Sequence, residues 1–268
     1  MQYISLNYKI SESKDLKLSF ENRGFLFGDG FFETIKVANN KIFNFKMHSK
    51  RIKKSLNLLC LDFDFCEEKI MNNILSLTKK NKITSASVKL VFFRSSEGRY
   101  FPKTNNCSIL ISCKNNNPNF LLNDVRINTF DDIKKSINFL SSLKSLNSLT
   151  YVMSAISAKK QGYDEAIIFN EKNFVIETTS SNLFFVLNDE LFTPHLNQGC
   201  VEGTMRELII NNFNVKEIKV KMDDLINSQE IILTNSLSIK SVTELNGVPL
   251  NNSQYANRFL EKVNQLIQ

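Results

Sequence analysis

An amine, a carboxylate and a cluster of hydroxyl groups follow one another within residues 142–185. Lys144 opens the stretch, Glu177 ends an apolar run, and the sequence TTSSN follows at 178–182. An amine that loses its proton can act as a nucleophile or a base, and rigid strand ends can hold such groups in one place. The alternative is a surface lysine and an edge glutamate, because most Lys and Glu side chains are solvated.

The elements around these residues are short and regular. A helical run follows Lys144, and a turn at Gly162-Tyr163-Asp164 separates it from the apolar strand AIIF. A second strand ends at Glu177, and the strand LFFV comes after the hydroxyl cluster. The pattern therefore predicts a lysine, a glutamate and hydroxyls at the ends of consecutive elements.

The composition predicts a globular, cytoplasmic protein. Of its 268 residues, 42% are hydrophobic, which is enough for one large or two smaller domains. The net charge of +7 is spread over a Lys/Asn-rich surface without a basic stripe, which argues against a nucleic-acid partner. No apolar run reaches membrane-spanning length, and the start does not resemble a signal peptide. Five cysteines without a CxxC pair predict free thiols and no metal site.

Two domains joined by a polar linker are expected. The first block, 1–114, reads as a small α+β domain with a strand at 1–10, a hairpin built from FFETIKV and KIFNF, and helices near 48–59 and 67–80. Residues 115–121 are the linker, since they are polar and contain proline. The second block, 122–268, alternates strands and helices, opens a helix at RELIINNF and ends in a helix at 253–268.

Six stretches in collinear order carry a family resemblance. They are RGFLFGDGFFETIKV, HSKRIKKSLNLL, LKSLNSL, GYDEAIIFNEKNFVIETTSSNLFFV, GTMRELI and LTNSL. Together they resemble the class IV, fold-type IV pyridoxal-phosphate enzymes, which include branched-chain and D-amino-acid aminotransferases and 4-amino-4-deoxychorismate lyases. The resemblance implies a small α/β domain, a larger barrel-like α+β domain, pyridoxal 5'-phosphate held between them, and a homodimer.

The resemblance also implies roles for individual residues. Lys144 would form a Schiff base with the cofactor aldehyde and later act as the proton-transfer base. Glu177 would pair with the pyridine nitrogen, and Arg51 would bind the phosphate with its planar guanidinium. Backbone groups at the start of a helix would add phosphate donors. The remaining cofactor candidates are Ser181, Asn182, Thr204, Met205, Asn235 and Ser236.

Substrate contacts are expected from the first block. Phe32 and Thr34 lie on the strand FFETIKV, and Arg94 and Arg99 flank the loop that would cover the cofactor. Arg99 could bind a substrate carboxylate or be a solvated loop residue paired with Glu97, and Arg94 competes for the same role.

Departures from the family pattern favour one activity. Leu149 stands where branched-chain aminotransferases carry a tyrosine, and the loop at 97–100 lacks the histidine of the D-amino-acid enzymes. The G-R-Y loop, the N-S-L turn and the short chain look more like the lyases. We therefore expect 4-amino-4-deoxychorismate lyase activity, which yields 4-aminobenzoate and pyruvate for folate synthesis. A branched-chain or D-amino-acid aminotransferase using 2-oxoglutarate is the alternative, and a non-catalytic binding protein is a remote one.

Overall fold

The computed structural model describes residues 2–267 and divides into two compact units. Among the described residues, one unit comprises 2–119 together with 143–147, and the other comprises 120–142 together with 148–267. The expectation that 122–268 forms one C-terminal domain is therefore wrong for five residues. Leu143–Asn147 belong to the N-terminal unit because the backbone N–H of Phe32 donates to the Lys144 carbonyl and that of Leu146 donates to Gly30.

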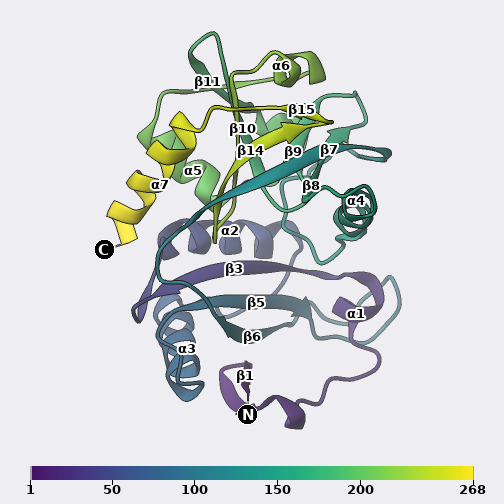
Figure 1. The fold of residues 1–268 in the computed structure, drawn as a ribbon. Coiled ribbons are helices and arrows are strands. Elements are labelled where there is room, and N and C mark those ends of the chain that lie inside the picture. Colours follow the sequence, from purple (N-terminus) through teal and green to yellow (C-terminus); the bar gives the residue numbers. More distant parts are fainter. Residues whose placement is uncertain (1, 268) are drawn as a thin grey trace. The chain divides into compact units, whose positions relative to one another are not determined.

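A six-stranded sheet forms the centre of the N-terminal unit (Figure 1). Its order is β2-β1-β6-β5-β3-β4, and the long strands β3, β5 and β6 pair antiparallel in a continuous register. Alternating apolar residues make one face of each strand a core face. The bounds are β1 Tyr3–Leu6, β2 Lys9–Glu12, β3 Gly30–Ala38, β4 Lys41–Ile42, β5 Ala86–Arg94 and β6 Cys107–Asn115.

Two amphipathic helices pack against this core face. They are α2 (Phe45–Leu58) and α3 (Glu67–Lys80), whose buried residues recur at helical spacing. Glu67 and Glu68 in the first turn of α3 and Lys79 and Lys80 in its last turn complement the helix dipole. Both predicted helices are thus present, α3 with the predicted bounds.

Two local features differ from the sequence-based expectation. The single strand expected at 1–10 is a hairpin, because Asn7 and Tyr8 adopt positive φ and reverse the chain. A short helix, α1 (Arg23–Phe27), lies within the glycine-containing segment, and the Asn22 side chain accepts a hydrogen bond from Phe25 at its start.

A nine-stranded sheet forms the C-terminal unit. Its order is β12-β11-β10-β13-β14-β7-β8-β9, and β15 pairs with β14. Strand β9, at one end, also contacts β10 and β11, so the sheet curls on itself. The bounds are β7 Leu122–Lys135, β8 Glu165–Asn170, β9 Val175–Thr178, β10 Asn182–Leu187, β11 Glu190–Pro194, β12 Val215–Ile218, β13 Glu230–Thr234, β14 Ile239–Leu245 and β15 Val248–Pro249.

Four α-helices accompany this sheet within residues 120–267, and the expected C-terminal helix is present as α7. Helix α4 packs against β7 and β8, and α7 packs against β13, β14 and β7. The helices are α4 Leu149–Lys160, α5 Thr204–Asn212, α6 Met222–Ile226 and α7 Gln254–Ile267. No helix within 2–267 is both long and apolar enough to cross a membrane.

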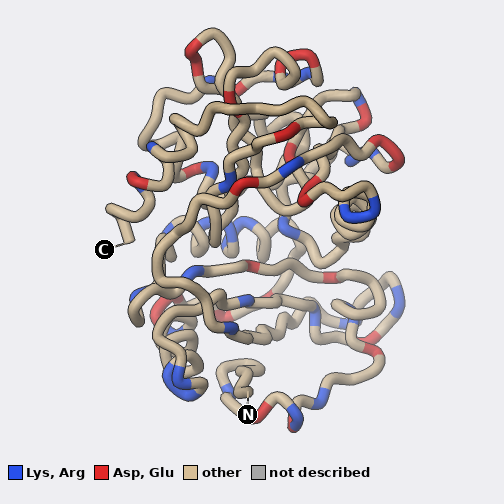
Figure 2. The backbone as a smooth tube through the Cα atoms, in the orientation of Figure 1, with Lys and Arg blue, Asp and Glu red and all other residues tan. Residues whose placement is uncertain are grey.

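Both units are mixed α+β, as the sequence predicts. Charges of both signs are spread along each unit (Figure 2). Within residues 2–267, no group of three His, Cys, Asp or Glu side chains is placed to hold a metal ion.

Candidate active site

The backbone of Lys144 is joined to strand β3. Its carbonyl accepts a hydrogen bond of 3.0 Å from Phe32, and Ser145 forms a bridge with Phe31. The Lys144 Nζ lies 4.8 Å from the centre of the Phe32 ring. This strand-like anchoring fixes the Cα of the lysine and leaves the half-buried side chain to reach its partner.

A buried ionic cluster lies in the same unit. Glu33 on β3 accepts two hydrogen bonds of 2.6 Å from Arg51 Nε and Nη2, and its Oε2 is 2.7 Å from His48 Nδ1. Both partners come from α2, one turn apart, so a single helix face delivers them. Arg51 is therefore a buried, oriented guanidinium and not the helix-surface cation that its lysine-rich neighbourhood suggests.

The pKa values of both titratable partners in this cluster, Glu33 and His48, are lowered. Burial alone would raise the pKa of Glu33, but the Arg51 charge and the hydrogen bonds from Arg51 and His48 lower it to about 2. The pKa of His48 is lowered by burial, and the positive charges of Arg51 and Lys144 add to this against the pull of Glu33. The charge of Lys144 thus reaches the cluster that orients Arg51, which brings these two predicted site residues into one neighbourhood.

The two candidate substrate arginines have different surroundings. Arg94 is buried, and its guanidinium donates to Asp29 Oδ2 at 3.0 Å, to Asn105 Oδ1 at 2.6 Å and to two backbone carbonyls. These hydrogen bonds hold the loop that follows Arg94 and engage its guanidinium with groups of the same unit. The Arg99 side chain is exposed, and its backbone carbonyl accepts a hydrogen bond from Arg23. The structure therefore favours a structural role for Arg94.

Lys89 is a candidate that the sequence did not single out. It lies on β5 opposite Thr34, is exposed, and places its Nζ 4.7 Å from the Phe32 ring centre. Phe32 and Thr34 share one face of β3 because strand residues alternate. The Phe32 ring thus contacts two ammonium groups, those of Lys89 and Lys144. Only the strand register, which pairs β3 with β5, reveals this arrangement.

In the C-terminal unit, three donors surround Glu177. Its Oε1 accepts from Lys135 Nζ at 2.8 Å and from the Tyr151 hydroxyl at 2.7 Å, and its Oε2 accepts from the Val201 N–H at 2.9 Å. The carboxylate is almost fully buried. A cation and two further donors thus satisfy both oxygens of this buried carboxylate.

Tyr151 is a second site residue that the sequence motifs did not predict. Leu149, at the position where branched-chain enzymes are expected to carry a tyrosine, is 64% exposed, and Tyr151 lies two positions later in α4. Burial, and then the charge and hydrogen bond of Glu177, raise the pKa of Tyr151 well above 10, so it is a hydrogen-bond donor at neutral pH.

A second buried carboxylate orders the hydroxyl cluster. Glu165 accepts from Thr178 Oγ1 at 2.6 Å, from Ser180 Oγ at 2.9 Å and from Ser181 Oγ at 3.1 Å, and it pairs with Lys240. Burial alone would raise the pKa of Glu165, but Lys240 and the hydroxyl donors lower it. The predicted cofactor residue Ser181 is thus held by a carboxylate.

Asn235 closes the turn between β13 and β14. Its Oδ1 accepts from the backbone N–H groups of Leu237 and Ser238, both at 3.0 Å, and its Nδ2 lies 3.4 Å from Ser181 Oγ. The structure therefore brings Asn235 and Ser181 together, and Ser236 lies within the turn that Asn235 shapes.

The start of α5 is shaped for close approach. Gly203 precedes the helix, no side chain caps it, and a Cβ at this position would lie 1.8 Å from Asn182 Oδ1. Asn182 in turn donates to the Val201 carbonyl at 2.9 Å. Thr204 and Met205 are the first two residues of α5, so their backbone N–H groups lie in the turn that has no acceptor within the helix.

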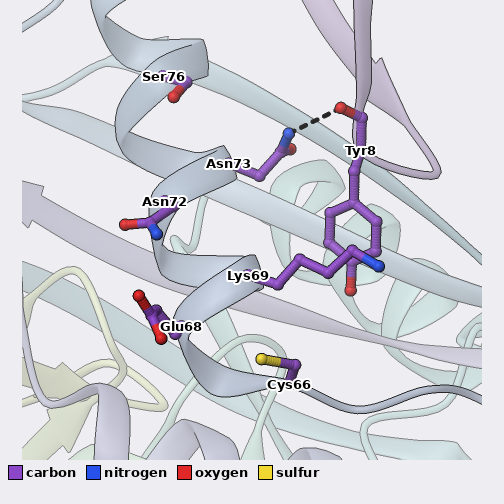
Figure 3. A pocket seen from close by; sticks show the side chains of 7 residues that line it. All are labelled: Tyr8, Cys66, Glu68, Lys69, Asn72, Asn73 and Ser76. Carbon is purple, nitrogen blue, oxygen red and sulfur yellow. Dashed lines mark hydrogen bonds between the residues drawn. The ribbon is translucent and has the colours of Figure 1, made fainter.

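A pocket of about 450 Å³ also occurs in the N-terminal unit, but it does not contain the predicted site (Figure 3). Helix α3 and the hairpin turn form it, and Asn73 donates to the Tyr8 carbonyl at 3.0 Å across it. Its lining residues are Tyr8, Cys66, Glu68, Lys69, Asn72, Asn73 and Ser76.

Comparison with known proteins gives consistent matches. The family model for "Amino-transferase class IV" matches residues 30–245. The Methanocaldococcus jannaschii protein named "Putative branched-chain-amino-acid aminotransferase" is 31% identical over 94% of this chain and 90% of its own. A Legionella pneumophila structure named "Putative 4-amino-4-deoxychorismate lyase" aligns with a TM-score of 0.87 at 25% identity, over 95% of this chain and 97% of that one.

The chain belongs to the class IV aminotransferases. A branched-chain aminotransferase structure from Thermoproteus uzoniensis, at 20% identity, covers 99% of this chain and 94% of its own with a TM-score of 0.92. This confirms the expected fold-type IV architecture. Enzymes of this family depend on pyridoxal 5'-phosphate, so this chain is a pyridoxal-phosphate-dependent enzyme.

The residues of this class IV chain fit the cofactor. An anchored lysine suits the aldehyde, and a buried carboxylate oriented by three donors suits a protonated pyridine nitrogen. A helix start that no side chain caps suits a phosphate, which needs backbone donors. Arg51, already oriented by Glu33, adds a planar cation of the kind that binds phosphate.

Proposed function

We propose that this enzyme is a 4-amino-4-deoxychorismate lyase. The observation that supports this proposal most directly is that the exposed Lys89 and the candidate catalytic Lys144 contact the same Phe32 ring. The substrate carries two carboxylates and one amine, so a cation beside the reacting lysine matches its charge. Lys89 would bind a carboxylate, and Phe32 would line the apolar side of the pocket together with Thr34.

Pyridoxal phosphate, when bound, supplies an aldehyde that reacts with amines and a ring that withdraws electrons. Lys144 would hold the aldehyde, Glu177 the pyridine nitrogen, and Arg51 with the N–H groups of Thr204 and Met205 the phosphate. Ser181, Asn182, Asn235 and Ser236 would shape the adjoining loops.

The protein's own step is a proton transfer at Lys144. Its Nζ would take the proton from the substrate carbon that bears the amine, while the ring of the substrate gains aromaticity. The carbon–oxygen bond to the enolpyruvyl group breaks, and its electron pair leaves with the oxygen. The leaving group is the enolate of pyruvate, whose methylene carbon takes up a proton, so the products are 4-aminobenzoate and pyruvate, and no external oxidant is needed.

An amino-acid aminotransferase is the second candidate, and the 31% identity to a relative named as a branched-chain enzyme favours it. Incubation of the purified holoenzyme with 4-amino-4-deoxychorismate should release 4-aminobenzoate and pyruvate in equal amounts. L- and D-amino acids with 2-oxoglutarate should give a slower reaction. Equal or faster transamination without 4-aminobenzoate would overturn the lyase proposal in favour of the aminotransferase.

Charge variants sharpen this test. Lys89→Met should raise KM about tenfold or more, because a charge-assisted contact is lost. Lys114→Met, an exposed lysine on the neighbouring strand β6, is the matched control and should leave KM unchanged. Arg99→Ala should also raise KM if Arg99 binds the second carboxylate, while cofactor content stays full. Unchanged kinetics for Lys89→Met would show that Lys89 does not bind the substrate, and the main support for the lyase proposal would be lost.

We also infer a homodimer from the outward face of α4. Leu149, Val152, Met153 and Ile156 are exposed apolar residues at helical spacing, and they form a continuous stripe. Monomeric proteins rarely leave such a stripe in water, and a second copy would cover it. Sedimentation should give twice the chain mass for wild type, and Val152→Glu should lower it. A monomeric wild type would contradict the inference.

A further inference from the structure

The carboxylate of Glu177 is held by side chains from two other elements. Lys135 is the last residue of β7, and Tyr151 lies in the first turn of α4. Their donor atoms lie 2.8 and 2.7 Å from the same oxygen, Oε1. The Lys135 ammonium also lies 5.3 Å from the Tyr151 ring centre, so the three groups form one contact cluster.

An irregularity in the sheet brings Lys135 to this place. Strands β7 and β8 run parallel with Phe130 opposite Ile168, but Lys135 is the residue opposite Asn170. A regular ladder would instead place Asp132 there. The additional residues in β7 thus place the basic side chain of Lys135, and not the acidic one of Asp132, beside Glu177. Glu177 itself pairs with Ile168 from β9, on the opposite edge of β8. A carboxylate in that position would oppose the charge of Glu177.

Packing fixes the phenol as well. The Tyr151 ring packs against buried Ile168, Ile176 and Cys200, so its hydroxyl has little freedom to turn elsewhere. Burial raises the pKa of the Cys200 thiol to about 12, which leaves this neighbour uncharged. The Lys135 side chain is 15% exposed and that of Glu177 4%, so water competes weakly for the pair.

We propose that Lys135 and Tyr151 are positioning residues that hold the Glu177 carboxylate in one orientation for the pyridine nitrogen of the cofactor. This inference rests on the proposed function of the site. The two residues act only through Glu177. Tyr151 supplies a donor from α4 in a chain whose helix carries Leu149 at the position of the family tyrosine.

Cofactor binding to the full-length apoprotein tests this inference without catalysis. Lys135→Met should weaken pyridoxal-phosphate binding about tenfold or more, and Tyr151→Phe should weaken it by a few fold. Both should shift the pH at which the visible absorbance of the bound cofactor changes. Lys135→Arg should restore much of the affinity. The matched controls are Lys134→Met, an exposed neighbour on β7, and Tyr163→Phe, and both should match wild type.

A double-variant cycle separates positioning from independent contact. In a Glu177→Gln background, Lys135→Met and Tyr151→Phe should cause little further loss, because their effect passes through the carboxylate. Wild-type affinity and wild-type pH behaviour for both single variants would overturn the inference, and so would full additivity with Glu177→Gln. If Lys135→Met fails to fold, Tyr151→Phe decides alone. A wild-type chain that binds no cofactor would instead overturn the proposed function, and this inference with it.

Discussion

Glu33 in the N-terminal unit and Glu177 in the C-terminal unit are both buried carboxylates with three donors, and their clusters differ in the cation. In the N-terminal unit, Glu33 is gripped through both oxygens by Arg51 and contacted by His48. In the C-terminal unit, Glu177 is held by Lys135 and Tyr151 on one oxygen and by a backbone N–H on the other.

The two cations, Arg51 and Lys135, differ in how freely their side chains can reorient. A guanidinium that makes two parallel bonds has one geometry, so Glu33 fixes Arg51 as much as Arg51 fixes Glu33. An ammonium on a flexible stem can turn, so Lys135 can hold Glu177 and still yield when another charged group approaches. The first cluster suits a permanent cation support, and the second suits a carboxylate that must accept a new partner.

The largest expected effect comes from breaking the Glu33 cluster. Glu33→Ala leaves Arg51 buried without its counter-charge and should lower the free energy of unfolding by about 3–5 kcal/mol. Urea denaturation of the apoprotein measures this. Glu97→Ala, at an exposed pair with Lys103, is the control and should cost about 0–1 kcal/mol. A cost below about 1 kcal/mol for Glu33→Ala would show that Arg51 finds another partner.

Acid should act on the same cluster. The folded-state pKa of Glu33 is about 2, below the unfolded value of 4.5, so the folded state binds fewer protons in this range. The stability that Glu33 contributes is therefore complete above about pH 4.5 and is lost as the pH falls towards 2, on the order of 3 kcal/mol. Denaturation midpoints measured across this window should fall less steeply in Glu33→Gln.

His48 should add an earlier step with the same direction. Its folded-state pKa is lowered from 6.5, chiefly by burial, so the unfolded chain takes up a proton that the folded chain resists. Stability should start to fall as the pH drops below about 6.5. His48→Gln should remove this first step, whereas retention of the step would place it on another group.

The sequence predicts the helices and strands well, but it predicts less well which segments pair with one another in space. Helix periodicity predicts α2 and α3, and strand alternation predicts β3, because these patterns are local. The return of Lys144 to the N-terminal unit could not be predicted. It depends on backbone bonds between residues more than 100 positions apart, to which side-chain periodicity gives no clue.

Single residues of the site show the same limit. Motif order selects Lys144, Glu177 and Arg51, but the partners that hold two of them, Glu33 and Lys135, carry no signal of their own. Glu33 lies within a strand where its neighbours alternate, and Lys135 reaches Glu177 only through an irregular ladder. Registers and bulges are set by tertiary packing, so the supports of a site are harder to predict than its motif residues.

Removing the other carboxylate should cost less than removing Glu33. Glu177→Ala should lower the free energy of unfolding of the apoprotein by about 1–3 kcal/mol, since Lys135 can turn its ammonium to solvent along its flexible stem. Parallel urea titrations of the two alanine variants give the comparison. A loss equal to that of Glu33→Ala would mean that Lys135 is as confined as Arg51, and the contrast between the clusters would disappear.

The smallest expected effect is that of one hydroxyl. Tyr151→Phe keeps the ring packed against Ile168 and Ile176 and removes a single donor from Glu177, which retains Lys135 and the Val201 N–H. The free energy of unfolding of the apoprotein should fall by about 0.5–1.5 kcal/mol, and Tyr163→Phe should change it by less than about 0.5 kcal/mol. If Tyr151→Phe cost as much as Glu177→Ala, the phenol and not the ammonium would be the main support of the carboxylate. That result would make the C-terminal cluster a neutral hydrogen-bond site, in contrast to the ionic cluster around Glu33.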